Sequence, residues 1–405
     1  MQGDLKVLSQ HTLNGYGGMG EGMSLQLARG GRRILWLAHE SAPKNFTGVD
    51  VSDPRSPKVV AQTDLPHKQM RSNSLETAGD LMAVAYQVQK YGLKPAGFEL
   101  FDISEPERPR SVGFFDASGP HSRGCHQLWF VDGKTVHMSC SDPELKPRNP
   151  KDDQIYRIVD VSNPSRPRAV GRWYLPGTMD GDAEAPPQRL APQFDAGFRA
   201  HNTNVYPERP DRCYLGYLDG GMMVLDIADP ARPKMVSRWT NSPTSSPPFN
   251  GFTHTVLPLF SRDLLIVTDE CIQDDGADWP KLVWVLDARD ERNLVSIGTL
   301  PVSGIKPLLN KGGRCGAHNL HENPPVKGAW KSEDIVLGTF FNAGLRVYDV
   351  RDPYDPKELA AFVPPAPNGA PAGTVQINDV FVDDRGIVFA VDRHAGGLYA
   401  LEMKL

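Results

Sequence analysis

The chain of 405 residues carries a formal net charge of −5, with acidic and basic side chains interspersed and no long basic run. This pattern argues against a nucleic-acid partner and against an anionic membrane surface. No stretch approaches the roughly 20 apolar residues of a membrane span, and the first residues, MQGDLKVLSQ, lack the pattern of a secretory signal. We therefore expect a cytoplasmic protein with no membrane partner.

Turn-forming residues and cysteines narrow the fold class. The 38 glycines and 36 prolines are typical of a chain with many tight turns and indicate an all-β protein. The five cysteines are scattered and include no CxxC pair. We therefore expect reduced thiols rather than a disulfide framework or a thiolate zinc site.

One sequence phrase recurs six times, and each copy predicts a β-hairpin. Alternating β-branched and apolar residues predict a strand, and a segment of the Asp-Pro-x-x-Pro kind turns the chain into a second strand. In chain order the copies are FTGVDVSDPRSPKVVAQTDL from Phe46, FELFDISEPERPRSVGFFDA from Phe98, YRIVDVSNPSRPRAVGRWYL from Tyr156, MMVLDIADPARPKMVSRWTN from Met222, VWVLDARDERNLVSIGTLPV from Val283 and LRVYDVRDPYDPKELAAFVP from Leu345.

The spacing of these hairpins predicts a propeller. Two further apolar runs precede each hairpin, which gives four strands per unit, and a period of roughly 50 to 65 residues is typical of a blade. The predicted blades cover residues 22–66, 70–118, 124–176, 199–241, 252–301, 316–364 and 376–405. The last unit has only three strands, so we expect the segment at residues 3–12 to complete the seventh blade and close the ring.

The repeated phrase resembles the LVIVD repeat, with VLDI, IVDV and LFDI at the position of that name motif. The resemblance covers essentially the whole chain. It implies an all-β, seven-bladed β-propeller that forms a single domain over residues 1–405. It implies little about a reaction, so function must be sought at the propeller axis.

Aligning the first strand of every unit gives one equivalent residue per blade. In blade order these residues are Met23, Asn73, His126, His201, His254, His318 and Asn378. Because the innermost strands line the channel, equivalent residues lie at one height around the axis. We therefore expect the four histidines to converge as metal ligands, and duplicated hydrogen-bonding core histidines are the alternative. Imidazole ligands suit Fe(II), Zn(II), copper or nickel better than Ca(II).

Two residues are candidates for a catalytic role beside the histidines. The end of the second strand returns to the level of the axial residues, which places Glu270 near His254. We expect Glu270 to orient a ligand histidine or to act as a general base, and a solvated loop acid is the alternative. In a regular strand His321 points away from His318, so we rank it lower, as a supporting or loop residue.

Arginines occur in the loops that lead into four of the inner strands. Their guanidinium groups would form a positive rim that binds carboxylates or phosphates in bidentate fashion, and ordinary surface charges are the alternative. We therefore expect a small anionic organic substrate. The candidate substrate-binding residues are Arg71, Asn73, Arg123, Arg199, Arg314, Asn378 and His394.

Two insertions rich in proline and glycine, at residues 177–198 and 241–251, lead into His201 and His254. Long loops of this kind are often lids over binding sites, and flexible linkers are the alternative.

Three functions fit these observations. The first is a non-haem Fe(II) oxygenase acting on a small acidic organic molecule that is also aromatic or unsaturated. Its four-histidine centre resembles, in architecture alone, that of the carotenoid-cleaving oxygenases. The second is a zinc-dependent hydrolase or lyase with Glu270 as general base. The third is a non-enzymatic protein-binding scaffold. For the enzymes we expect one divalent transition metal, iron first and zinc second.

Overall fold

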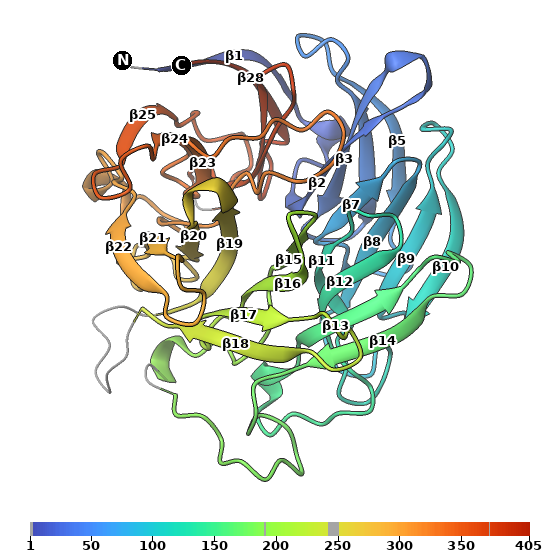
Figure 1. Cartoon of the computed structure of the whole chain (residues 1–405). Coiled ribbons are helices and arrows are strands. Elements are labelled where there is room, and N and C mark those ends of the chain that lie inside the picture. Colours follow the sequence, from blue (N-terminus) through green and yellow to red (C-terminus); the bar gives the residue numbers. More distant parts are fainter. Residues whose placement is uncertain (1–2, 190–191, 242–250, 372) are drawn as a thin grey trace.

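The computed structural model describes residues 3–189, 192–241, 251–371 and 373–405. Its strands form seven antiparallel sheets arranged in a ring (Figure 1). The all-β class and the seven-bladed propeller that the repeats predicted are therefore confirmed. No helix in these described ranges is long and apolar enough to cross a membrane.

The first four blades follow one another along the chain, each beginning with its inner strand. The strands of blade one are β2 (Met19–Leu27), β3 (Arg33–His39), β4 (Lys44–Asp50) and β5 (Lys58–Asp64); of blade two, β6 (Met70–Arg71), β7 (Leu75–Ala78), β8 (Leu81–Val88), β9 (Gly97–Asp102) and β10 (Arg110–Asp116); of blade three, β11 (Cys125–Trp129), β12 (Thr135–Cys140), β13 (Ile155–Asp160) and β14 (Arg168–Trp173); and of blade four, β15 (Thr203–Tyr206), β16 (Arg209–Gly216), β17 (Met222–Asp226) and β18 (Lys234–Trp239).

The last three blades complete the ring. Blade five contains β19 (Thr253–Leu259), β20 (Leu264–Asp269), β21 (Val283–Asp287) and β22 (Val295–Thr299); blade six contains β23 (Ile335–Thr339), β24 (Leu345–Asp349) and β25 (Lys357–Phe362); and blade seven contains β26 (Ile377–Val382), β27 (Ile387–Asp392), β28 (Leu398–Lys404) and β1 (Asp4–His11). Short 3-10 helices lie at Leu13–Gly15, Arg29–Gly31, Pro150–Asp152, Pro192–Phe194, Phe260–Arg262 and Lys306–Leu308.

The N-terminal strand closes the ring, as expected. Strand β1 pairs with β28 in antiparallel register from Asp4 opposite Lys404 to His11 opposite Leu398. Strands β1 and β28 lie side by side in Figure 1. Closure by this strand covers the backbone edge that β28 would otherwise expose.

Blade six departs from the expected four strands. Its innermost segment pairs with β23 through the Leu320–Gly338 bridge and a few backbone hydrogen bonds, including one of 2.9 Å from the His318 amide to the Thr339 carbonyl. Positive φ at Gly316 and Asn323 breaks the regular pleat on both sides of this segment. The segment therefore reaches the axis without forming a regular ladder.

The repeated hairpin turn depends on its aspartates. Asp50 Oδ1 accepts a hydrogen bond of 3.0 Å from the Ser52 amide, and Asp53 Oδ1 accepts one of 3.0 Å from the Arg55 amide. Short polar side chains stabilise turns by such local contacts with the backbone. Asp160 and Asp226 make the first of these contacts in their own blades, which explains why the phrase recurs.

Apolar side chains fill the spaces between neighbouring blades. Between blades one and two, for example, Trp36, Phe46 and Phe101 pack edge to face, with the Phe46 and Phe101 ring centroids 5.0 Å apart. Burial of such rings stabilises each interface between blades. Because the apolar side chains pack between the blades, polar side chains can occupy the axis.

Candidate metal centre

The structure brings the four predicted histidines together at the propeller axis. His126 lies in β11 and His254 in β19, while His201 precedes β15 and His318 lies on the inner segment of blade six. All four are buried, and His254 and His318 are wholly inaccessible to solvent. The inner segments of four blades thus place one imidazole each at the axis.

Short distances join these rings into one cluster. The Nε2 atoms of His126 and His201 are 2.8 Å apart. The ring centroids of His201 and His254 are 3.6 Å apart, and those of His254 and His318 are 4.6 Å apart. The ring edges that carry Nε2 therefore face a shared space.

The opposite ring nitrogen of every histidine is held by a neighbouring group. His126 Nδ1 lies 3.0 Å from Gln87 Oε1, and His201 Nδ1 lies 2.8 Å from Asn202 Oδ1. His254 Nδ1 lies 2.8 Å from the Thr255 hydroxyl, and His318 Nδ1 lies 2.7 Å from the Asn378 carbonyl. Such contacts orient a ligand imidazole, and in His254 and His318 the Nε2 atom has no hydrogen-bond partner among the described residues.

Glu21 is a fifth member of the cluster that the sequence reasoning missed. Its Oε2 lies 3.4 Å from His201 Nε2 and 3.5 Å from His254 Nε2, and its Oε1 lies 3.6 Å from His318 Nε2. Alignment on apolar positions selected Met23, but the pairing of β2 with β3 shifts register between Met19 and Met23. This irregularity moves the axial position two residues earlier.

A signal for Glu21 was present in its neighbours. Glu21 stands between two glycines in the sequence MGEGM. A Cβ on Gly20 would lie 2.3 Å from the Asn73 carbonyl oxygen, and one on Gly22 would lie 2.2 Å from the Leu75 nitrogen. The backbone of blade one therefore lies too close to blade two for any residue larger than glycine. A glycine inside a strand often marks a place where a ligand or another backbone segment approaches closely.

Glu270 completes the cluster, where it was expected beside His254. Its Oε2 lies 3.7 Å from His254 Nε2, and its Oε1 lies 3.5 Å from His318 Nε2. Arg314 donates a hydrogen bond of 2.6 Å to Oε1. Burial raises the pKa of Glu270, but His318, Arg314 and His254 more than offset this effect and lower it to about 2. The carboxylate is therefore ionised, as a metal ligand must be.

His126, His201 and His318 favour their neutral form. Burial, followed by the effect of neighbouring His254, lowers the pKa of His201 to about 3. Burial also lowers the pKa of His126 and of His318. Neutral imidazoles keep the lone pair that a transition metal requires.

Asn73 and Asn378 hold the cluster in place. Asn378 donates from Nδ2 to the Met19 and Gly20 carbonyls at 3.0 and 2.8 Å, which fixes the backbone before Glu21. Asn73 is wholly buried with φ of 46°, and its carbonyl accepts a hydrogen bond of 2.6 Å from the Glu21 amide. These contacts tie blades seven, one and two together around the axis.

His321 and His394 lie apart from the four axial histidines. His321 Nε2 lies 2.8 Å from the Trp330 carbonyl, and its Nδ1 accepts a hydrogen bond from the Val382 amide. Both ring nitrogens thus bind backbone between blades six and seven. His394 lines a cavity of about 350 Å³ beside Arg314 and Arg393.

The four predicted arginines lie in unequal surroundings. Arg71 pairs with Glu40 at 2.5 Å, and Arg123 binds both oxygens of Asp153 at 2.6 and 2.8 Å. Arg199 Nη1 lies 3.9 Å from Oδ1 of that same Asp153, and its buried Nε has no hydrogen-bond partner in the part of the chain that the structure describes. Of the described arginines at this rim, Arg199 therefore has the least complete charge neutralisation.

A cavity connects three of these arginines. It has a volume of about 640 Å³, and Arg123, Arg199 and Arg314 line it together with the rings of Tyr91 and Phe252. A space of this size, with apolar walls and a few directed polar groups, is typical of a site for a small organic ligand. Within the insertions expected to act as lids, residues 190–191 and 242–250 lie outside the described residues.

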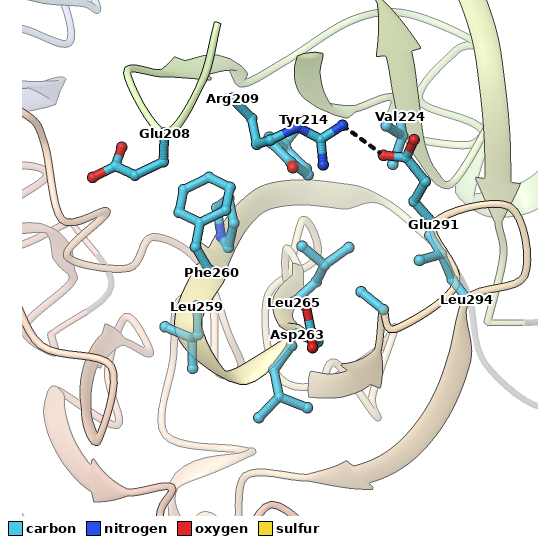
Figure 2. Close-up of a pocket in the computed structure, with 13 residues that line it drawn as sticks. Glu208, Arg209, Tyr214, Val224, Leu259, Phe260, Asp263, Leu265, Glu291 and Leu294 are labelled. Carbon is cyan, nitrogen blue, oxygen red and sulfur yellow. Dashed lines mark hydrogen bonds and ion pairs between the residues drawn. The ribbon is translucent and has the colours of Figure 1, made fainter. Parts of the chain in front are cut away.

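A second hollow lies between blades four and five. Figure 2 shows Leu259, Phe260 and Leu265 around it, with the Arg209–Glu291 ion pair of 3.3 Å at its edge. Its volume is about 210 Å³. Its lining residues include neither a histidine nor a cysteine, so they do not form a transition-metal site.

Comparisons with known proteins agree with the fold. Residues 153–174 and 213–241 match the sequence model of the LVIVD repeat. The structure is similar to the β-propeller domain of Cps50 (Swd1) from Myceliophteria thermophila, with a TM-score of 0.58 and 12% identity over 98% of this chain and 99% of that one. It is also similar to a protein from Lactobacillus plantarum, with a TM-score of 0.56 and 10% identity over 84% of this chain and 85% of that one.

No curated protein sequence matches the chain. At 10 to 12% identity the structural likenesses show the fold alone. The repeat match and the ring of seven sheets lead to the same assignment. The chain is a seven-bladed β-propeller that carries LVIVD repeats.

Proposed function

We propose that this protein is a metal-dependent enzyme that binds a transition metal at the propeller axis and acts on a small organic anion. One observation supports this proposal above all. In each of four buried histidines a neighbouring group holds Nδ1, and Nε2 points to a space shared with Glu21 and Glu270. Buried polar atoms are almost always hydrogen-bonded. Here His254 Nε2, His318 Nε2 and Glu21 Oε2 have no hydrogen-bond partner among the described residues, as expected of atoms that bind a metal ion.

The donor set favours iron and oxygen chemistry. Two histidines and one carboxylate with open positions are typical of non-haem Fe(II) oxygenases. Glu21 forms such a set with His126 and His201. When bound, Fe(II) would supply dioxygen activation, while the residues of the chain hold the ion, bind the substrate anion and exclude bulk water.

The arginine-lined cavity supports an anionic substrate. Arg199, with its incomplete pairing, is placed to bind a carboxylate, and Tyr91 and Phe252 offer apolar surface to the rest of the molecule. We therefore propose aromatic or unsaturated carboxylic acids as the first substrates to test.

A zinc hydrolase or lyase with Glu270 as general base fits less well. A carboxylate with a pKa of about 2 is a weak proton acceptor near neutral pH. Arg314 also donates a hydrogen bond to Glu270 Oε1, the oxygen that lies 3.5 Å from His318 Nε2. A scaffold without enzymatic activity would not require the unpaired ring nitrogens at the axis.

Metal analysis tests the proposal. The protein is purified under anaerobic conditions without an affinity tag, and its metals are measured by plasma mass spectrometry. Iron that is lost when His126, His201, His254 and His318 are all replaced by alanine, together with oxygen uptake on adding an aromatic carboxylate, is the expected result. Bound zinc without oxygen uptake would favour the hydrolase, and no metal in the unaltered protein would overturn the proposal.

His137→Ala is a matched control. This histidine is buried in β12 of blade three, where its Nδ1 lies 2.7 Å from the Tyr156 hydroxyl, away from the axial cluster. Its loss should leave metal content unchanged. A fall in metal content in this variant would point to a general loss of structure rather than to lost ligands.

A further inference from the structure

The ligand atoms at the axis form three overlapping sets, one of which joins His201 and His254 to Glu270. Glu21, His126 and His201 form one set, and Glu21, His254 and His318 form another, with the ligand atoms of each set within 4.8 Å of one another. Among the residues that the structure describes, no such set contains all four histidines. Glu21 therefore belongs to a set with each pair of histidines, and His201 and His254 are also neighbours, with ring centroids 3.6 Å apart.

A single ion is too small to collect all these donors. With metal–nitrogen bonds of about 2.1 Å, two donors on opposite sides of one ion are about 4.2 Å apart. Donors that belong to no common set are not all within 4.8 Å of one another, a limit wider than this separation. His126 falls in no set with His254 or His318, so one ion would leave part of the cluster without a bond.

Glu21 Oε2 lies near both His201 and His254, whereas Oε1 lies near His318. Oε2 lies 3.4 Å from His201 Nε2, and Oε1 lies 3.6 Å from His318 Nε2. Oε2 is buried and has no hydrogen-bond partner, and the same is true of His254 Nε2 and His318 Nε2. A carboxylate in this position can give one oxygen to each of two ions.

We propose that the axis holds a pair of transition-metal ions bridged by Glu21, an inference that rests on the proposed metal-dependent function. His126 and His201 bind the first ion, and His254, His318 and Glu270 bind the second. Bridged ions of this kind lie about 3.5 to 4 Å apart, a separation that one carboxylate spans. The single divalent ion expected from the sequence is replaced by two.

The two ions would have unequal surroundings. Glu270 lies 3.7 Å from His254 Nε2 and 3.5 Å from His318 Nε2, so the second ion has two carboxylates among its ligands. The first has two histidines and Glu21 alone. The first ion therefore keeps more open positions, and it is the better candidate for contact with a substrate.

Stoichiometry and magnetic coupling test this inference. Metal-free protein is titrated with Mn(II) under argon, the bound metal is counted by plasma mass spectrometry, and the spectrum is recorded by electron paramagnetic resonance. We expect two ions per chain and an exchange-coupled signal. The double variant of His126→Ala with His201→Ala, and that of His254→Ala with His318→Ala, should each keep one ion and lose the coupling.

Glu21→Gln and His137→Ala make the result independent of folding. The first is close in shape to the original residue and should remove the coupled signal while the melting temperature stays near that of the unaltered protein. The second should keep both ions and the coupling. One ion per chain at saturation, lost in either double variant, would overturn the pair but preserve the metal-dependent function. No bound metal in the unaltered protein would overturn both.

Discussion

Arg314 donates a hydrogen bond of 2.6 Å to Glu270 Oε1, and the same oxygen lies 3.5 Å from His318 Nε2. A guanidinium in this position holds the carboxylate ionised and fixes its direction. Arg314 is thus a positioning residue for the metal cluster. It also lines the cavity through which we expect the substrate to approach.

Replacing Arg314 with glutamine should weaken metal binding without unfolding the protein. Loss of a group that orients a ligand typically costs about 10- to 100-fold in metal affinity. Competition titration with a chelating dye measures the affinity. Arg351→Gln removes an exposed arginine paired with Asp349 on an outer turn and should leave the affinity unchanged. Equal affinities in the Arg314→Gln and unaltered proteins would show that Glu270 needs no such support.

Replacing Gly22 with alanine should both destabilise the protein and displace Glu21. The added Cβ would lie 2.2 Å from the Leu75 nitrogen and 2.8 Å from the Ser74 Cα, and backbone atoms cannot move aside cheaply. We expect a loss of about 1 to 3 kcal/mol in the free energy of unfolding, by analogy with overpacked cores. Chemical denaturation measures this loss, and metal titration measures the displacement.

Gly251→Ala is the control for this substitution. A Cβ at Gly251 would meet no atom of the described residues within 4 Å, so the stability and metal affinity of this variant should equal those of the unaltered protein. If Gly22→Ala behaved in the same way, the close approach of blade one to blade two would not be what places Glu21.

The repeat made the fold and the four histidines predictable. Each blade repeats the same strand pattern, so a position in one inner strand identifies its counterparts in the others. The repeat correctly predicted that His126, His201, His254 and His318 lie together at the axis. It failed in blade one, because the register shift between Met19 and Met23 displaced the axial residue from the apolar pattern.

The pairing of charged side chains could not be predicted from the sequence. Arg123 and Arg199 look alike as loop arginines, yet Asp153 binds Arg123 in bidentate fashion and lies 3.9 Å from Arg199. Which arginine holds the carboxylate depends on side-chain geometry across a blade interface. A repeat alignment contains no information of that kind.

Asp379 should make stability depend on pH in the metal-free protein. Its burial raises its pKa well above the ordinary value, and Glu322, Glu21 and Glu76 raise it further, although the Val380 amide lowers it in part. A carboxyl with a raised folded-state pKa contributes stability below its unfolded pKa of about 3.9, and this contribution is lost as pH rises toward the folded-state pKa.

Asp379→Asn removes that titration. The free energy of unfolding of the variant should therefore gain on that of the unaltered protein as pH rises from about 5 to about 8, as measured by denaturation at several pH values. Asp4→Asn, at an exposed position of β1, should give a curve parallel to that of the unaltered protein. A constant difference for Asp379→Asn across this range would contradict the prediction.

Arg199 should be the principal anion-binding residue of the cavity. Its Nε has no partner, and burial lowers the pKa of its guanidinium, so a bound carboxylate would restore a charge-assisted hydrogen bond that the folded chain lacks. Loss of a hydrogen bond to a charged group costs about 1.5 to 3 kcal/mol, which corresponds to at least about tenfold in affinity. Arg199→Gln should therefore weaken the binding of benzoate, measured by calorimetry on metal-free protein, by at least this factor.

Arg351→Gln should bind benzoate as the unaltered protein does, because Arg351 lies on an outer turn. Unchanged binding in Arg199→Gln would mean that the anion docks on another arginine of the rim, and the assignment of Arg199 would be wrong even if the metal site were right.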